Sequence, residues 1–586
     1  MNFKENTRHE ILGHSAGMRA VTTASIVMCP QLPASGLNQS MHHPENPLRI
    51  DEIFDGLSRQ GDDTGVQISQ FLIANAIRSV HPAAVARIFE STTQYPQMPV
   101  LHQIPPKKTK FWQFGGIFED EGTISGTYRV HDSIFIAQLG LKAPRTPSDR
   151  RNDFSRRLWL VHGDQLTAQR IRSVKLEQRS AERSYDRRDW MLGLPAWFHI
   201  QMNLLYTIVR THWTGSNGLH QSRHCLKADS TAWGRTQYGP ENIKYHLVAP
   251  IVVQAFASRV TAMFYSHLRQ RGMIEDTSAT VPELVGDMDD IVARLSPSMF
   301  SEIIEEIRLQ AFTLDAWEGA RHKDVEFRSM CRMLQEIELF LVVQYAVKRG
   351  DIGHLRRIVD PLIIAFFGAG QQNYGREMLF YRWNLHSSVN SDELQYAILA
   401  SGLVNWSGRR DTFKAIDLGL EHLNGYCKTE MTCYKNSTTD IDLIFNRVCL
   451  SNTFVGEVRT KLEATFGKHM SGEHTVMDAI LDMFSLARNL YGSHLAAPRD
   501  HGRPEEPFDS PNIFQEGVDV LEDRVRDFNN VHVRENCTPD ACVDSSADTI
   551  DDSFANLDDF FDLENADSDT PDLIDLTSGL NETEHG

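Results

Sequence analysis

A carboxylate at position 164 stands where many α/β folds keep their reactive groups. A short apolar run, Leu158–Val161, is followed by His162, Gly163 and Asp164, and a helix-like segment begins at Gln165. Such a run is typical of a strand, and the carboxyl ends of buried strands are where α/β proteins gather their chemistry. We therefore expect Asp164 to lie at a strand end as a candidate catalytic residue. The alternative is that Asp164 only caps the next helix by accepting backbone N–H groups.

The segment after Asp164 carries a group of basic side chains. Ile171 and Val174 would form the apolar side of a helix, and cations would surround the remainder. Acidic residues such as Glu177 and Asp186 occur in or beside the same segment, so a salt-bridged surface helix is an alternative to a nucleic-acid contact. The residues expected to contact nucleic-acid phosphates are Arg170, Arg172, Lys175 and Arg179.

Other side chains could take part in chemistry, but each also has a structural explanation. His199 could act as a base or could be a satisfied structural histidine. Asp417 and Glu421 are four residues apart and would share one helix face, either as a rival carboxylate site or as a surface acidic pair. Two His and Cys sets lack the paired ligand spacing of zinc sites. These sets are His220, His224 and Cys225, and His422, Cys427 and Cys433.

The composition predicts a mostly globular chain with an acidic end. The 586 residues are 41% hydrophobic, which is enough for a large core and for more than one structural unit. The formal net charge is -19, and residues 540–586 contribute 15 Asp and Glu with no Lys or Arg. The rest of the chain therefore carries only -4. Since the body is close to neutral, its basic patches are free to meet a polyanion.

Several features together predict a soluble intracellular protein. Eight cysteines are scattered without a Cys-x-x-Cys pair, which favours free thiols in a reducing compartment. The first residues lack the apolar core of a secretory signal. The apolar stretch Leu247–Tyr265 is interrupted by Gln254 and Arg259, which indicates a buried helix rather than a membrane span.

The order of strand-like and helix-like segments divides the chain into four parts. Residues 1–240 alternate strand and helix patterns, as an α/β core does. Residues 241–365 predict an all-helical insertion, and residues 366–496 predict further helices that complete the core. Residues 497–586 are rich in Pro, Asp, Ser and Asn, and we expect them to form a disordered acidic tail.

Several short motifs, in this order, resemble a large fungal family known only as a domain of unknown function. They are Gly-Asp-Gln-Leu-Thr at 163–167, Pro-Ala-Trp-Phe-His at 195–199, Gly-Asp-Ile-Gly at 350–353 and Asn-Tyr-Gly-Arg-Glu at 373–377. Several motifs in the correct order are more specific than any one of them. The resemblance extends to about Glu430 and implies no known activity.

The layout of these motifs resembles a DNA transposase with a ribonuclease-H-like core. In such a protein a strand-end aspartate precedes a helix, a helical insertion interrupts the fold, and a glutamate on a late helix completes the site. The resemblance implies an α/β fold with an N-terminally incomplete ribonuclease-H-like core, and it makes Asp164 and Glu377 the catalytic residues and metal ligands. Such carboxylates would hold two Mg²⁺ or Mn²⁺ ions that activate the attacking oxygen and stabilise the leaving oxygen of a phosphodiester.

The first carboxylate of that pattern has no counterpart here. The family carries an Asp-Asn pair just before a segment that resembles residues 2–8, and this chain begins at that point. We therefore expect the initial strand and its carboxylate to be missing. A two-metal site without one bridging ligand binds metal poorly, so we expect little or no nuclease activity.

The acidic tail has two patterns of its own. Residues 551–563 interleave aspartates with Phe and Leu, as in disordered segments that fold on a partner. Residues 572–577 resemble a SUMO-interacting motif, which would add as a strand to the edge of the modifier. The motif's core residues are Leu573, Ile574, Asp575 and Leu576.

Two functions from different classes follow from these patterns. The first is a transposase-derived nuclear protein that binds or processes DNA through an incomplete two-metal carboxylate site. The second is a noncatalytic nuclear interaction protein that binds SUMO or another protein through its tail. In both cases we expect no membrane partner, and we favour the nucleus over the cytoplasm.

Overall fold

The computed structural model describes most of the chain up to Val533. The described residues are 2–4, 18–58, 62–143, 154–213, 225–274, 282–313, 324–434, 447–451, 479–499 and 509–533, with short gaps before residue 46 and at 92, 93, 242 and 387, together with scattered residues between 454 and 466. The acidic segment 540–586, including the SUMO-like residues 573–576, lies outside the described residues. The predictions for that segment therefore stay predictions.

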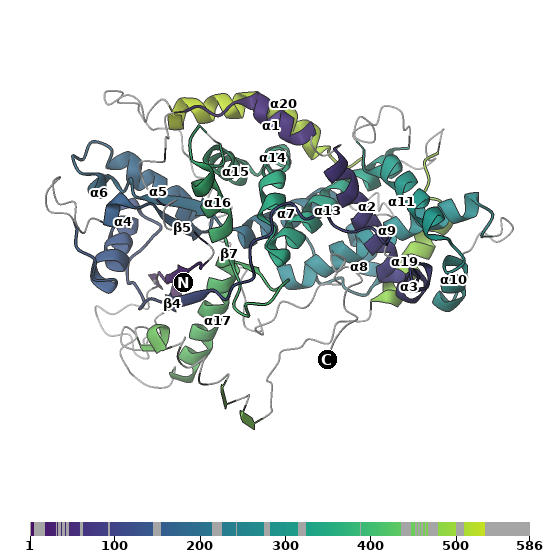
Figure 1. Cartoon of the computed structure of the whole chain (residues 1–586), viewed down its shortest axis with the longest axis horizontal. Helices are drawn as coiled ribbons and strands as arrows, with labels where there is room; N and C mark the ends of the chain where they lie inside the picture. Colours follow the sequence, from purple (N-terminus) through teal and green to yellow (C-terminus); the bar gives the residue numbers. More distant parts are fainter. Residues whose placement is uncertain are drawn as a thin grey trace.

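Helices make up most of the described chain, more than the predicted α/β alternation implies (Figure 1). The helices before residue 240 are α1 (Ile50–Ser58), α2 (Asp63–Val80), α3 (Pro82–Ile88), α4 (Ile124–Asp132), α5 (Gln165–Glu177), α6 (Ser184–Arg187), α7 (Trp197–His212) and α8 (Leu226–Ala232). Those after it are α9 (Tyr245–Gln270), α10 (Val285–Val292), α11 (Pro297–Ala311), α13 (Val325–Arg349), α14 (Ile352–Gly368), α15 (Gln372–Asn384), α16 (Asp392–Ser401), α17 (Ile416–Tyr434), α19 (Ile480–Gly492) and α20 (Ile513–Phe528).

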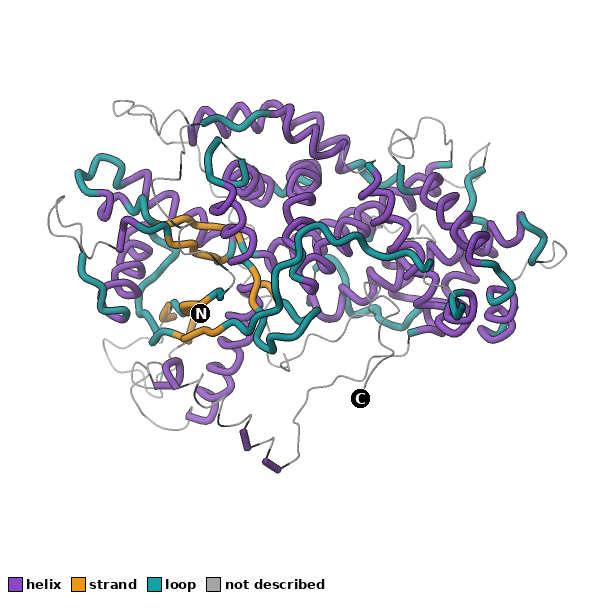
Figure 2. Tube along the Cα trace, viewed as in Figure 1, coloured by secondary structure: helices purple, strands orange, loops and turns teal. Residues whose placement is uncertain are grey.

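The strands are short and gather in one half of the molecule (Figure 2). Within the described ranges they form four separate two-stranded sheets rather than one central sheet. The antiparallel pairs are β1 (Asn2–Lys4) with β2 (Met18–Ala20), β3 (Ser25–Met28) with β4 (Lys110–Gln113), and β7 (Leu403–Val404) with β8 (Lys414–Ala415). The parallel pair is β5 (Trp159–Gly163) with β6 (Met191–Pro195). The fold is thus α-rich, with a small βαβ unit.

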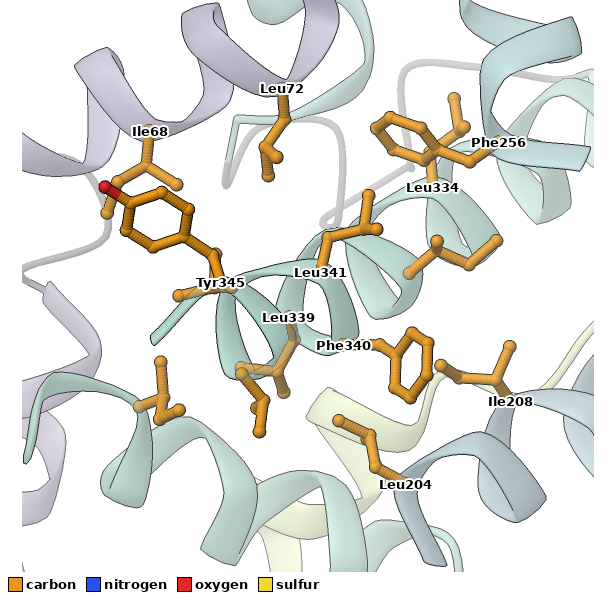
Figure 3. Close-up of a cluster of buried hydrophobic side chains, with 14 of the residues drawn as sticks. Ile68, Leu72, Leu204, Ile208, Phe256, Leu334, Leu339, Phe340, Leu341 and Tyr345 are labelled. Carbon is orange, nitrogen blue, oxygen red and sulfur yellow. The ribbon is translucent and has the colours of Figure 1, made fainter. Parts of the chain in front are cut away.

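Helix α13 forms the centre of the main hydrophobic core. Side chains on several sides of it are buried, which is the pattern of a helix enclosed by its neighbours rather than one at the surface. Figure 3 shows Phe340 beside Leu204 and Ile208 of α7, and Leu341 facing Leu72 of α2. The same continuous cluster extends from Leu48 to Val533, and it therefore crosses the boundaries predicted at 240, 365 and 496.

Helix α9 contains the apolar stretch for which the sequence predicted a buried helix. By length and composition α9 could cross a membrane, and 89% of its most apolar window is buried inside the protein. Its Arg259 is buried completely and donates to Asp229 of α8 at 2.7 Å. Burial of the apolar helix together with its charge pair agrees with the prediction.

The predicted start of the disordered tail at residue 497 is wrong for residues 509–533. This segment forms α20, whose buried side chains include Phe514, Leu521 and Val525. The helix lies across α14 so closely that a Cβ atom on Gly517 would be 2.1 Å from the backbone oxygen of Ile364. A Cβ on Gly368 would be 1.7 Å from the backbone oxygen of Ile513. Two glycines therefore permit backbone contact between the helices.

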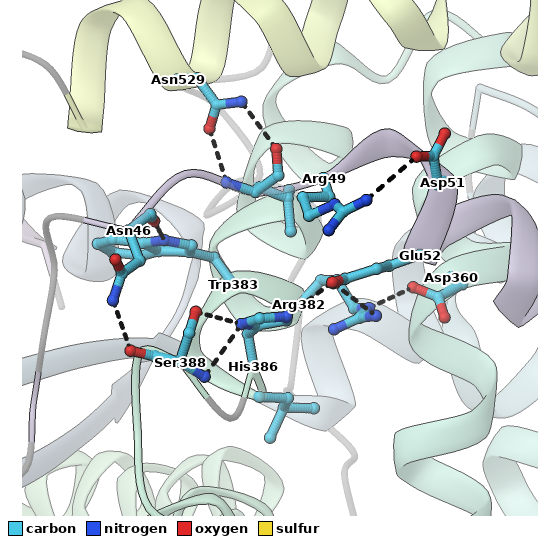
Figure 4. A network of polar contacts seen from close by, with 12 residues as sticks. Asn46, Arg49, Asp51, Glu52, Asp360, Arg382, Trp383, His386, Ser388 and Asn529 are labelled. Carbon is cyan, nitrogen blue, oxygen red and sulfur yellow. Dashed lines mark hydrogen bonds and ion pairs between the residues drawn. The ribbon is translucent and has the colours of Figure 1, made fainter.

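Polar contacts fasten the chain before α1 to α15 and to the end of α20 (Figure 4). Asn529 pairs with the Leu48 backbone through both its amide atoms, at 2.9 Å and 2.8 Å. The indole N–H of Trp383 donates to the Asn46 carbonyl at 2.7 Å. Arg382 donates to Asp360 at 2.8 Å and lies 3.5 Å from Glu52. In Figure 1 α1 and α20 run side by side over this region.

We predict that Gly517→Ala loosens α20 from α14. The new methyl group must displace backbone, so we expect a loss of roughly 1–3 kcal/mol in the free energy of unfolding and faster proteolysis after α19. Urea unfolding and limited proteolysis measure the two effects. A matched control is Gly286→Ala in α10, where a Cβ meets open space and helix propensity predicts a gain of up to about 1 kcal/mol. Equal protease protection of α20 in both variants would contradict the prediction.

Candidate acidic site at the ends of strands β5 and β6

The parallel strands β5 and β6 bring their carboxyl ends to one edge. Trp159 pairs with Met191 and Gly163 pairs with Pro195, and α5 and α6 lie in the connection between the strands. Gly193 leaves space for α5, because a Cβ there would lie 3.1 Å from the Ile171 side chain. Residues that follow the two strands therefore lie near one another, and Asp164 lies at a strand end as the sequence predicted.

Asp164 follows β5 and caps α5. Its Oδ1 accepts a hydrogen bond from the Thr167 backbone N–H at 2.7 Å, and its side chain is half-buried. The capping contact that we considered as an alternative is therefore present. A cap satisfies one of the free N–H groups of the first turn, so this carboxylate has a structural task whatever else it does.

Glu377 lies on α15 and is almost fully buried, at 1% exposure. Its Oε1 forms an ion pair with Arg172 of α5, and the Arg172 guanidinium also lies over the Phe380 ring, 3.8 Å from the ring centroid. Burial raises the pKa of the Glu377 carboxyl, the Arg172 charge opposes that shift, and the Asp164 charge adds to it. Asp164 and Glu377 therefore lie close enough to repel each other.

A third carboxylate, Asp417 at the start of α17, holds the first turn of α7. It accepts backbone N–H groups from Phe198 at 3.1 Å and from His199 at 3.0 Å, and its Oδ2 lies 2.8 Å from the His199 Nδ1. The sequence left two interpretations of Asp417 and Glu421 open, a rival carboxylate site or a surface acidic pair. Asp417 is buried, so it does not belong to a surface pair. It caps α7 from another helix, because Ala196 at the N-cap position has no side-chain acceptor.

His199 carries a positive charge at neutral pH. Burial lowers its pKa, but the hydrogen bond and charge of Asp417, with the charges of Asp164 and Glu421, raise the pKa to about 9. The nearby Tyr374 hydroxyl is buried, and burial together with the charges of Asp164, Asp417 and Glu377 raises its pKa well above the usual value. The site therefore contains three neighbouring carboxyl groups together with two protein cations, Arg172 and His199.

The three carboxyl groups do not fit a pair of divalent metal ions. Asp164 accepts from Thr167, Glu377 pairs with Arg172, and Asp417 accepts from the first turn of α7. Among the oxygens of these three carboxyl groups, Glu377 Oε2 is the one that is buried without a hydrogen-bond partner. The pKa of the Glu377 carboxyl is raised, which disfavours the deprotonated form that a metal ion requires. Across the described ranges, no three His, Cys, Asp or Glu side chains gather as a metal site would require.

The basic residues of α5 do not form a free cationic face. Arg172 points to Glu377, and Lys175 is half-buried, with burial lowering its pKa to about 8. Arg170 is also half-buried. Arg179, which follows the end of α5, is the exposed member of the four predicted residues. The predicted salt-bridged surface helix does not describe Arg172, whose ion-pair partner Glu377 lies on α15, and the predicted nucleic-acid contact stays a prediction.

The residues that complete the site gave little signal in the sequence. The interval between Arg172 and Glu377 in the sequence matches no motif, so nothing predicted their pairing. Arg172 was one of several cations in its segment. The sequence likewise gave no sign of the hydrogen bond between His162 of β5 and Ser401 of α16, which is 2.8 Å long. Burial lowers the pKa of that histidine to about 4, so it is neutral and structural.

A comparison with protein families places this site inside a shared unit. A family model described as a family of unknown function (DUF6589) matches residues 47–474, well over half of the chain. The chain belongs to this family. The matched span contains β5, β6 and every residue of the acidic site, whereas it leaves out β1 to β3, α19 and α20. No curated protein and no solved structure matches the chain.

We predict that Arg172→Met lowers the free energy of unfolding by about 3–5 kcal/mol near neutral pH, because the variant leaves a buried carboxylate without its partner. Adding Glu377→Gln to the same chain should recover about half of the loss. Urea unfolding measures both. Arg526→Met is the matched control, because Arg526 pairs with Asp523 at the exposed surface, where such pairs contribute about 0–1 kcal/mol. A double variant no more stable than Arg172→Met would refute the pairing argument.

We also predict that stability falls as pH rises through about 9. The folded-state pKa of His199 is raised from 6.5, so its contribution is fully present below pH 6.5 and is lost as pH passes about 9. The loss should be on the order of 3 kcal/mol. His199→Asn keeps a donor toward Asp417 but does not titrate, and its stability should change less over this interval. Thermal unfolding at a series of pH values tests this, and parallel curves for the two proteins would contradict it.

Proposed function

We propose that this chain is a nucleic-acid-binding protein that descends from a transposase-like nuclease and has lost strand cleavage. The order of its elements supports the ancestry: a strand-end Asp164, a following helix, a long helical segment and then Glu377 on α15. In a ribonuclease-H-like transposase the corresponding groups hold two divalent ions. On this proposal β5, β6 and α15 are the remnant of that core, and the nucleus is where the protein meets its ligand.

The buried ion pair between Arg172 and Glu377 supports the second part of the proposal, the loss of strand cleavage. In a two-metal site the negative charge of the carboxylates is balanced by metal ions. Here the guanidinium of Arg172 and the imidazolium of His199 balance Glu377 and Asp417. Since these cations belong to the protein, the acidic site supports the fold without a metal ion. Its role is then to fix α5, α7, α15 and α17 against the strand pair.

The test is a nicking assay on supercoiled plasmid with Mg²⁺ or Mn²⁺. We expect no nicking by the chain above that of Asp164→Asn, and the same for Glu377→Gln. Electrophoretic mobility shift on the same DNA should show binding by all three proteins. Metal-dependent nicking by the chain that both variants lose would overturn the loss of cleavage. An absence of any shift, with single-stranded or duplex DNA, would overturn nucleic-acid binding.

A further inference from the structure

Two loops far apart in the sequence are locked together on the surface near β4. Thr109 donates its backbone N–H to the Asn405 carbonyl at 2.7 Å, and Asn405 donates its N–H to the Thr109 hydroxyl at 2.9 Å. Gly408, with a φ of +74°, brings the second loop against Lys108, where a Cβ would lie 3.2 Å from the Lys108 Cβ. The two loops therefore present one joint surface.

The second loop is held rigidly by its own hydrogen bonds. The Asn405 amide donates to the Arg409 carbonyl at 2.7 Å, and its Oδ1 accepts from the Gly408 N–H at 2.7 Å. The Arg409 N–H donates to the Ser407 hydroxyl at 3.0 Å. A loop backbone held in this way loses little further conformational entropy when a ligand binds.

The joint surface carries exposed cations that have no ion-pair partner in the described structure. These residues, which we call the basic surface, are Lys107, Lys108, Lys110, Arg409 and Arg410. The adjacent carboxylate, Asp411, is bonded to Arg349 at 2.6 Å instead. On α6 and beside it, by contrast, arginines pair with local aspartates, as Arg183 does with Asp186 at 2.6 Å. An uncompensated positive patch of this kind attracts a polyanion.

An aromatic side chain stands beside these cations. Successive residues of a strand point to opposite sides, so Lys110 and Trp112 share one face of β4, its outer face. The Trp112 side chain is 47% exposed. On the neighbouring β3, Met28 pairs in register with Lys110 and is 53% exposed. An exposed indole next to lysines offers a base a surface on which to stack.

We infer that the basic surface and Trp112 bind a single-stranded segment of nucleic acid. The cations would contact successive phosphates and the indole would stack on an unpaired base. A duplex keeps its bases stacked inside, so it would use the cations but not Trp112. This inference deepens the proposed function, on which it rests, by naming the surface and the form of the ligand.

The position of the basic surface relates it to the acidic site. The second loop leads through β8 directly into α17, where Asp417 stands three residues after Lys414. The Lys414 ammonium lies 6.0 Å from the centroid of the Trp406 ring, and Trp406 lies against Phe111 of β4, 5.4 Å between ring centroids. The basic surface and Asp417 of the acidic site are thus connected through β8 and the start of α17.

The test measures binding of a fluorescein-labelled oligothymidine to the full chain by fluorescence anisotropy, over a series of KCl concentrations. Lys108→Glu with Arg409→Glu should weaken binding at least tenfold and reduce the slope of log K against log salt by about 2. Trp112→Ala should weaken single-strand binding roughly 5- to 100-fold and leave duplex binding nearly unchanged. Arg294→Glu with Lys227→Glu is the matched control, because both are exposed cations outside this surface, and it should bind as the unaltered chain does. Circular dichroism verifies that each variant is folded.

The outcomes separate this inference from the proposed function. If the unaltered chain binds DNA and both double variants bind equally well, the basic surface is refuted while nucleic-acid binding stands. If Trp112→Ala weakens duplex binding and single-strand binding equally, the single-strand assignment is refuted. It is also refuted if the variant weakens neither. If the chain binds a peptide of residues 540–586 but no oligonucleotide, and Lys108→Glu with Arg409→Glu abolishes that binding, the surface serves the chain's own acidic segment and both proposals fail.

Discussion

The balance of charge inside the acidic site is the constraint on which the surrounding elements depend. Glu377 and Asp417 are buried, and a buried carboxylate is tolerated only when cations or N–H donors compensate it. Arg172 from α5 and the first turn of α7 with His199 supply that compensation. Because each pair joins two different helices, the same contacts that neutralise the charges also fix the positions of these helices beside β5 and β6.

The helical body buries most of the apolar side chains. Helix α13 lies inside its neighbours, and α20 covers α14 at a distance that only glycine permits. The main core is continuous from α1 to α20 and includes Leu192 and Leu194 of β6. A second buried cluster, which contains Phe135, Ile171 and Trp190, packs against Trp159 and Val161 of β5. Glu377 and Asp417 of the acidic site are buried, whereas Lys108 and Arg409 are exposed on loops.

Local sequence patterns predicted individual helices and strands better than they predicted how these elements pack together. The apolar run at 158–161 corresponds to β5 and the apolar stretch at 247–265 to α9, because the composition of each segment by itself decides its structure. Helix α20 was missed although its apolar residues recur every three or four positions, since Pro- and Asp-rich neighbours dominated the composition. Asp164 was located correctly at a strand end, but its pairing with other groups depended on residues far away in the chain.

The sequence by itself determined the strand-end position of Asp164, the buried character of α9 and the acidic composition of residues 540–586, because these are properties of contiguous residues. Only the tertiary structure decided that Arg172 faces Glu377 rather than solvent, that Asp417 caps α7, and that the loops at 109 and 405 form one surface. The physical reason is that ion pairs and interhelical caps depend on distance in space, and the sequence interval between two residues does not limit that distance once the chain has folded.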